Sequence, residues 1–108
     1  MIVFAIEFMK KNLSQKLTIE MIAQELHISE STFKRYFHEI TDVTPMEYLI
    51  NLRIQQSKKM IRTTNKSITF IAYECGFYDS SHFLRLFKKF EGITHSEYKK
   101  LQIEKNNQ

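Results

Sequence analysis

The sequence predicts an all-α protein of seven helices, in which one helix-turn-helix unit occurs twice and a long helix joins the two copies. Three observations support this fold class. Helix-breaking residues are scarce, with two Gly and one Pro in 108 residues. Hydrophobic residues make up 43% of the chain, which is enough for a core. The third observation is an internal repeat that covers most of the sequence.

Matched residues at nearly constant offsets reveal the repeat. At an offset of 49, Ile19, Ile22, Ala23 and Glu25 recur as Ile68, Ile71, Ala72 and Glu74. At an offset of 50, Ser31, Phe33, Arg35, Phe37, Thr44, Glu47 and Tyr48 recur as Ser81, Phe83, Arg85, Phe87, Thr94, Glu97 and Tyr98. The slip of one residue falls in the predicted turn, where an insertion costs least.

Capping signals and apolar spacing locate the helices. The predicted N-caps are Thr18, Ser29, Ser67 and Asp79, and Thr44 and Thr94 begin capping boxes with Glu47 and Glu97. The predicted helices cover roughly 2–13, 18–26, 29–40, 45–63, 67–75, 79–91 and 95–104. The side chains expected to face inward are Ile19, Ile22, Ala23, Leu26, Phe33, Tyr36, Phe37 and Ile40 in the first copy, and Ile68, Ile71, Ala72, Cys75, Phe83, Leu86, Phe87 and Phe90 in the second.

These elements divide the chain into three parts. Residues 1–44 form the first helix-turn-helix subdomain, residues 45–63 the linker helix, and residues 64–108 the second subdomain. Pro45 suits the first position of the linker helix. At 1.5 Å per residue the linker helix is about 28 Å long. Two helix-turn-helix units that read one face of DNA need a separation of about 34 Å, so this helix is a suitable spacer.

The second helix of each copy presents a polar outward side. Its members are Ser31, Lys34, Arg35 and His38 in the first copy, and Ser80, Ser81, His82, Leu84, Arg85 and Lys88 in the second. Arginine suits a bidentate contact with guanine, and it stands at the equivalent place in both copies. Leu84 would contact a thymine methyl group or be an ordinary surface leucine. A solvated helix face is the alternative for one such side, but two matched sides favour contact with DNA bases.

Charge supports a nucleic-acid partner. The net charge is +4, and residues 55–108 hold ten basic and five acidic residues against six and seven in residues 1–54. The second half is therefore expected to provide most of the non-specific attraction to DNA. The candidate phosphate contacts are Lys58, Lys59, Arg62, Lys88 and Lys89. A solvated surface role is the alternative for each lysine.

Catalysis and metal binding have little support in the sequence. There is no Gly-rich phosphate loop and no Ser/His/Asp arrangement with a supporting motif, so no catalytic residue is assigned. His27, His38, His82 and His95 lack metal-ligand spacing and a pair of Cys partners, so neither a metal nor a cofactor is expected. The better rival to DNA binding is a helical protein-interaction module, which would explain the helices and caps but not the paired arginines.

The sequence also argues against a membrane protein. No apolar stretch approaches the ~20 residues of a membrane span, and residues 1–7 lack the basic flank and cleavage site of a signal peptide. An amphipathic membrane binder is disfavoured because the apolar faces are expected to be used in the core of the repeat. Cys75 is a single cysteine in an apolar run, which indicates a buried thiol and a reducing, cytoplasmic location.

The second copy carries the most specific motif. It reads Ile68-x-x-Ile71-Ala72-x-x-Cys75-Gly76-Phe77-x-Asp79-x-Ser81-x-Phe83-x-Arg85-x-Phe87-Lys88-x-x-x-Gly92-x-Thr94. Together with Tyr48-Leu49-x-x-x-Arg53 in the linker helix, this motif resembles the DNA-binding domain of the AraC/XylS family of bacterial regulators. The resemblance covers residues 17–100.

The resemblance implies a homeodomain-like fold with two helix-turn-helix units that read adjacent major grooves of double-stranded DNA. The base-reading helices would be Ser29–Ile40 and Asp79–Glu91, with bases facing Ser31, Lys34, Arg35, Ser80, Ser81, Leu84 and Arg85. Members of the family are mostly activators that recruit RNA polymerase, and some repress. An activator is therefore expected rather than a repressor.

Three positions depart from the family pattern, and one domain is missing. Asp42 stands where the family has Gly, His95 where it has Pro, and Ser57 where it has Ala. All three lie at helix ends or packing positions, so they affect local geometry more than function. Most members also carry a separate sensing domain. The chain is therefore either a short stand-alone regulator or the C-terminal part of a longer one, and the start inside a predicted helix favours the second.

Overall fold

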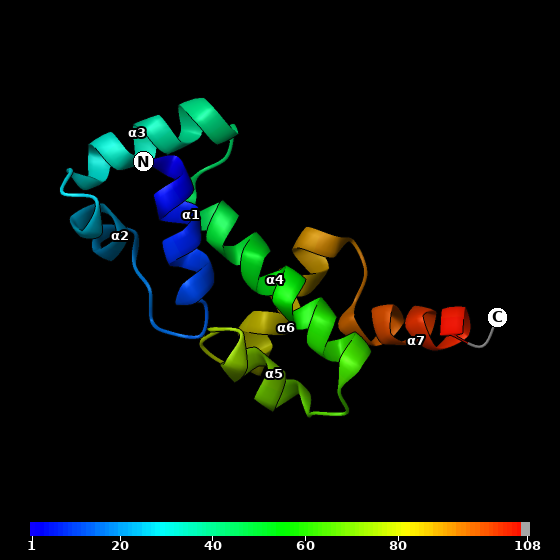
Figure 1. Ribbon diagram of the computed structural model, residues 1–108. Coiled ribbons are helices and arrows are strands. Elements are labelled where there is room, and N and C mark those ends of the chain that lie inside the picture. The colour runs from blue at the N-terminus through cyan, green and yellow to red at the C-terminus, as the bar shows by residue number, and fades with distance from the viewer. Residues whose placement is uncertain (107–108) are drawn as a thin grey trace. The chain divides into compact units, whose positions relative to one another are not determined.

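The computed structural model describes residues 1–106, and within them the secondary structure consists of seven α-helices. They are α1 (Ile2–Lys11), α2 (Ile19–Glu25), α3 (Glu30–Thr41), α4 (Pro45–Thr63), α5 (Ile68–Glu74), α6 (Ser80–Glu91) and α7 (His95–Asn106), shown in Figure 1. The predicted all-α class and the seven helices are confirmed. Predicted and observed helix ends differ by about two residues or fewer, which is the usual uncertainty of such boundaries.

The chain forms two compact units, Met1–Leu52 and a second that begins at Arg53, and α4 runs through the boundary between them. In the first unit α2 packs against α1 and α3. In the second unit α6 packs against α5 and α7. Each unit therefore contains one pair of packed helices joined by a short turn, which is the arrangement that the repeat predicts.

Each unit has a core of apolar side chains. The buried residues of the first unit are Ile2, Ala5, Met9, Leu17, Ile19, Ile22, Ala23, Phe33, Phe37 and Leu49. The buried residues of the second unit include Ile54, Ile61, Ile71, Ala72, Cys75, Phe77, Phe83, Phe87 and Tyr98. The predicted buried thiol is confirmed, because Cys75 is fully buried and burial raises its pKa to about 12.

The repeated aromatic residues form the same arrangement in both units. In the first, the ring of Phe37 lies edge-on to Phe33 at 5.6 Å and to Tyr48 at 5.4 Å between centroids. In the second, Phe87 lies 5.8 Å from both Phe83 and Tyr98. These distances are typical of stabilising aromatic pairs. The rings link the second helix of each pair to the helix that follows it.

Both turns between the paired helices end the first helix in the same way. After α2, Ile28 donates a backbone hydrogen bond to Ala23 and His27 donates one to Gln24. After α5, Phe77 and Gly76 donate equivalent bonds to Ala72 and Tyr73. This is the Schellman pattern, which needs one residue with positive φ. His27 takes φ 58° in the first turn and Gly76 takes φ 87° in the second.

The predicted capping residues are also in place. The side chains of Thr18, Ser29, Ser67 and Asp79 each accept a hydrogen bond from a backbone N–H of the first turn of the helix that follows. Thr94 and Glu97 form a reciprocal capping box with two bonds of 3.1 Å. Hydrogen bonds of the Glu97 carboxylate with the backbone N–H and the side chain of Thr94 hold the pKa of Glu97 below its ordinary value.

The prediction of inward-facing residues was wrong at two positions of α3. Tyr36 is 40% exposed and Ile40 is 66% exposed, whereas Phe33 and Phe37 are fully buried. Leu26, Ile68, Leu86 and Phe90 are half-buried. Helical periodicity gives the direction in which a side chain points, but not whether a neighbouring element covers it. Ile40 points in nearly the same direction as Phe33 but lies in the last turn of its helix.

Candidate nucleic-acid interface

The outward face of α3 consists of Ser31, Lys34, Arg35 and His38, and all four side chains are exposed. Their spacing of i, i+3, i+4 and i+7 places them in one row along the helix. The Lys34 ammonium lies 3.0 Å from the Glu30 carboxylate, an exposed pair that solvent weakens. The Arg35 guanidinium lies over the Tyr36 ring at 5.2 Å from its centroid. This contact limits the motion of Arg35 and leaves its donors accessible.

The outward face of α6 consists of the residues Ser80, Ser81, His82, Leu84, Arg85 and Lys88. Ser81, Arg85 and Lys88 are exposed, so their polar groups are available to a partner. Ser80 and Leu84 are half-buried, and Leu84 borders a small cavity of about 240 Å³ together with Lys88 and Thr94. The exposed row on α6 is therefore narrower than the sequence indicates.

His82 lies at the N-terminal rim of this face and packs inward. Its ring centroid lies 6.0 Å from that of Phe77, in an edge-on arrangement. Its Nδ1 atom is buried and has no hydrogen-bond partner within the described residues. The contact with Phe77 joins the turn to the first residues of α6, so His82 helps to orient the start of that helix.

The candidate phosphate contacts have different surroundings. Lys59, Lys88 and Lys89 are exposed. Arg62 donates a hydrogen bond of 2.7 Å from Nη1 to the Tyr98 hydroxyl, and the residue as a whole is exposed. Lys58 pairs with Glu91 at 2.7 Å, and its side chain is 21% exposed. Its ammonium also lies 5.5 Å from the centroid of the Tyr98 ring. The Lys58 ammonium therefore has its partners within the second unit and is not available to a DNA phosphate.

Sequence reasoning passed over two exposed tyrosines of the second unit. Tyr73 is 75% exposed on α5, and Tyr78 is 85% exposed just before the N-cap Asp79. Their hydroxyl groups can donate hydrogen bonds to an anion. Helical spacing places Tyr73 opposite the buried Ile71 and Ala72. This spacing alone could have predicted from the sequence that Tyr73 is exposed. Tyr78 has no such signal, because a turn residue has no helical period.

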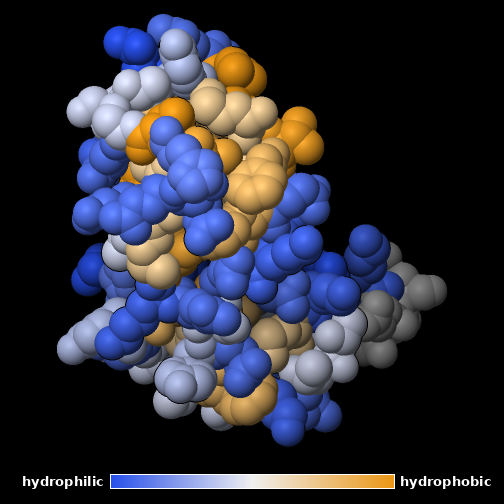
Figure 2. Space-filling view, turned by 60° about the vertical axis from the view of Figure 1, so that its left-hand side comes forward, coloured by the Kyte–Doolittle hydropathy of each residue, from blue (hydrophilic) through white to orange (hydrophobic). Residues whose placement is uncertain are grey.

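The surface also shows apolar groups on α1, which lies outside the repeat. Figure 2 shows hydrophobic side chains gathered in the upper part of the view, over the first unit. On α1, Val3 is 74% exposed and Phe4 is 51% exposed, while Ile2, Ala5 and Met9 are buried. The expectation that apolar faces are used in the core concerned the repeat, and α1, outside it, leaves part of its apolar surface exposed. This ten-residue helix is apolar around most of its circumference, and its neighbours cover one side.

Within residues 1–106, no three His, Cys, Asp or Glu side chains gather as they would around a metal ion. No helix in the described part of the chain has the length and apolar character needed to cross a membrane.

Comparisons with known sequences identify relatives of the chain. A family model described as a helix-turn-helix domain matches residues 22–101. The chain is 32% identical over 93 residues to the HTH-type transcriptional regulator ArgR of Pseudomonas aeruginosa, covering 86% of this chain and 28% of ArgR. It is 35% identical over 95 residues to the bifunctional transcriptional activator/DNA repair enzyme AdaA of Bacillus subtilis, covering 88% and 45%. The chain spans less than half the length of these two relatives.

Solved structures share the fold. An AraC-type transcriptional regulator from Chromobacterium violaceum superposes with a TM-score of 0.87 at 26% identity, covering 94% of this chain and 90% of that one. The DNA-binding domain of AdpA, solved in complex with a target DNA, superposes with a TM-score of 0.92, covering 99% and 96%. Its identity is 22%, so this likeness concerns the fold.

Proposed function

Since the chain belongs to the AraC/XylS family of helix-turn-helix DNA-binding domains, we propose that it is a transcription regulator that binds double-stranded DNA through the outward faces of α3 and α6. The observation that carries this proposal is the match between Arg35 and Arg85. Both are exposed, both lie two residues before a fully buried phenylalanine (Phe37 or Phe87), and they stand 50 positions apart in the repeat. A solvated surface gives no reason for that match.

Each unit supplies the elements of a base-reading site. The first helix of the pair, α2 or α5, buttresses the second, and the cap at Ser29 or Asp79 fixes where the second begins. The exposed donors then face the edges of bases in the major groove, where arginine recognises guanine. The exposed residues Ser31, Lys34, Arg35, His38, Ser81 and Arg85 carry the base contacts, and Ser80, His82 and Leu84 border them.

Phosphate contacts would position the two reading helices. Lys59, Lys88, Lys89 and Arg62 are accessible for this purpose. We do not include Lys58 among the phosphate contacts, because the Glu91 carboxylate neutralises the charge of its ammonium. We add the Tyr78 hydroxyl to the proposed phosphate contacts, because Tyr78 is exposed next to the start of α6.

The continuous helix α4 sets the proposed mode of binding. Its 19 residues run through the boundary between the units without a break, which corresponds to a length of about 28 Å. We infer that residues 1–44 and 64–108 act as two reading subdomains on adjacent major grooves, with residues 45–63 as the spacer. The two outward faces differ in sequence, so the two half-sites should differ as well.

The proposed regulatory role rests on the resemblance to the family. By family resemblance, the DNA-bound protein would act as an activator that contacts RNA polymerase, and a sensing domain elsewhere in the full protein would control it. ArgR, RhaS and AdaA are all named as transcriptional regulators or activators, and the chain matches a part of each.

Selection from a random pool of duplex DNA, followed by binding at several salt concentrations, tests the proposal. The expected winner is a non-palindromic site with two dissimilar boxes about one helical turn apart, bound less tightly as salt rises. Enrichment of no sequence, together with salt-independent binding, would instead favour a helical protein-interaction module. Selection of a palindromic site would contradict the proposal that α3 and α6 recognise different sequences, but it would not contradict DNA binding.

A further inference from the structure

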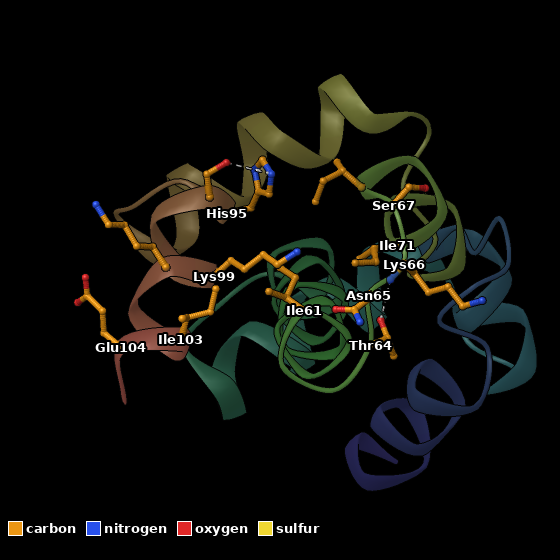
Figure 3. A pocket seen from close by; sticks show the side chains of 13 residues that line it. Ile61, Thr64, Asn65, Lys66, Ser67, Ile71, His95, Lys99, Ile103 and Glu104 are labelled. Carbon is orange, nitrogen blue, oxygen red and sulfur yellow. Dashed lines mark hydrogen bonds between the residues drawn. The ribbon is translucent and has the colours of Figure 1, made fainter. Parts of the chain in front are cut away.

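The second unit contains a cavity that the proposed DNA surface does not use. It has a volume of about 690 Å³ and lies between the end of α4, the segment that leads into α5, and one face of α7, as Figure 3 shows. Its apolar lining consists of Ile61, Ile68, Ile71 and Ile103. A neighbouring cavity of about 430 Å³ shares Ile61, Lys99 and Ile103 with it. These volumes are in the range of small-molecule sites.

Cationic side chains line the same cavity. They are Lys66, Lys99 and Lys100, and the titratable His95 ring lies beside them. Figure 3 shows the Lys99 side chain directed toward the part of the cavity that Ile61 and His95 line. Neither Lys34–Glu30 nor Lys58–Glu91 involves Lys99, and the Lys99 ammonium forms no ion pair with a carboxylate of the described residues. Glu104 also lines the cavity, but its carboxylate points away from Ile61 and His95.

The charge of Lys99 acts on His95, which lines the same cavity. Burial and the charge of Lys99 both hold the pKa of His95 below its ordinary value. A hydrogen bond of 3.2 Å joins Nε2 of the His95 ring and the Ser96 hydroxyl. An anion near the Lys99 ammonium would offset the charge that disfavours the protonated form of His95, and it would give Lys99 the counter-charge that it lacks.

We propose that this cavity binds a small carboxylic acid with an apolar body. The hydrocarbon body would lie on Ile61, Ile71 and Ile103, and the carboxylate would lie between Lys99 and His95. An uncharged hydrocarbon would leave Lys99 without a partner, and an inorganic anion would leave the isoleucines unused. The cavity joins α7 to the start of α5, so a bound acid would tie together both helices that pack against α6.

Titration of the chain with octanoate, followed through the backbone amide signals in NMR spectra, tests the site. We expect saturable shifts in the segments Thr64–Ile71 and His95–Ile103, together with a concentration-dependent rise in melting temperature. Acetate lacks the hydrocarbon body and 1-octanol lacks the charge. Each should bind at least about tenfold more weakly than octanoate, because each loses one of the two contacts.

Three results of this titration would overturn the proposal. Equal affinity for octanoate and 1-octanol would show that Lys99 and His95 take no part. Binding of inorganic phosphate as tight as octanoate would indicate an anion site that belongs to the DNA surface. Shifts concentrated on α1, where Val3 and Phe4 are exposed, would place the acid on another apolar surface.

Two matched pairs of variants separate a specific site from general attraction. Lys99→Gln should weaken octanoate binding about fivefold, whereas Lys105→Gln, an exposed lysine of α7 outside the cavity, should not. Ile103→Asn should weaken binding, whereas Leu101→Asn should not. Ile103 and Leu101 are 54% and 51% exposed, so both variants should fold. Equal effects within either pair would contradict the site, and none of this bears on DNA binding.

Discussion

The Lys58 ammonium lies 2.7 Å from the Glu91 carboxylate and joins α4 to the end of α6. Both side chains are mostly buried, with exposures of 21% and 16%, so solvent screens the pair less than a surface pair. The Lys58 ammonium also contacts the Tyr98 ring. Sequence reasoning assigned Lys58 to phosphate binding, because an isolated lysine in a basic region gives no indication of a partner 33 residues away.

Replacement of Lys58 should therefore affect folding more than DNA binding. We expect Lys58→Ala to lower the free energy of unfolding by about 1–2 kcal/mol, since Glu91 would be left without its partner. Urea unfolding of this variant, of Glu91→Ala and of the double variant would measure the coupling. The exposed neighbour Lys59 provides the control, because Lys59→Ala should leave stability nearly unchanged. A reduced salt slope of DNA binding in Lys58→Ala would restore the phosphate role.

The two arginines and Lys88 should differ in what they recognise. Arg35→Ala and Arg85→Ala should each cost about 1–3 kcal/mol on the selected site and relax the base preference in one box. Lys88→Ala should weaken binding to all sequences similarly and reduce the salt slope by about one. Competition binding with selected and random duplexes would measure both effects. Equal losses on the two duplexes in an arginine variant would assign that arginine to phosphate.

Asp42 is a position at which a substitution should increase the stability of the first unit. It ends α3 in the left-handed conformation with φ 63°, and Gly92 ends α6 in the same way with φ 79°. Glycine takes this conformation without the steric cost that other residues incur. We expect Asp42→Gly to raise the free energy of unfolding by up to about 1 kcal/mol in urea unfolding, and Gly92→Ala to lower it by about 1 kcal/mol. Destabilisation by Asp42→Gly would mean that the Asp42 side chain contributes more than the backbone strain costs.

Truncation of a buried ring in the cluster of Phe83, Phe87 and Tyr98 should strongly destabilise the second unit. Phe87 is fully buried between Phe83 and Tyr98, so Phe87→Ala should cost about 3–5 kcal/mol of stability. Ile40→Ala serves as the matched comparison, because Ile40 is 66% exposed and should cost less than about 0.5 kcal/mol. Thermal and urea unfolding of the two variants would measure the contrast. A small loss in Phe87→Ala would contradict the packing of the second unit.

His95 should make stability depend on pH. Burial and the charge of Lys99 lower its pKa in the folded state below the ordinary value of about 6.5. The unfolded chain then binds the proton more readily, so stability is lost as pH falls through this range. Between pH 7.5 and 5.5, His95→Gln should lose less stability than the wild type in urea unfolding. An identical decline in His95→Gln would assign the pH dependence to other groups.

The sequence by itself determined the helices, their caps and the repeated core. These features depend on contacts within a few residues, so helical periodicity and the side-chain oxygens of Ser29 and Asp79 are sufficient to predict them. The outward direction of Arg35 and Arg85 follows from the same period. The offset of 50 predicted that Phe37 and Phe87 would share an environment, and the two ring clusters confirm it.

The tertiary structure decided which of these side chains are free. The pairing of Lys58 with Glu91, the hydrogen bond of Arg62 to Tyr98 across 36 residues, and the exposure of Ile40 depend on how neighbouring helices end and cross. The cavity lined by Ile61 and Lys99 has the same origin, because its walls come from separate helices. Local periodicity contains no information on such contacts, since they join segments that approach each other only when the chain folds.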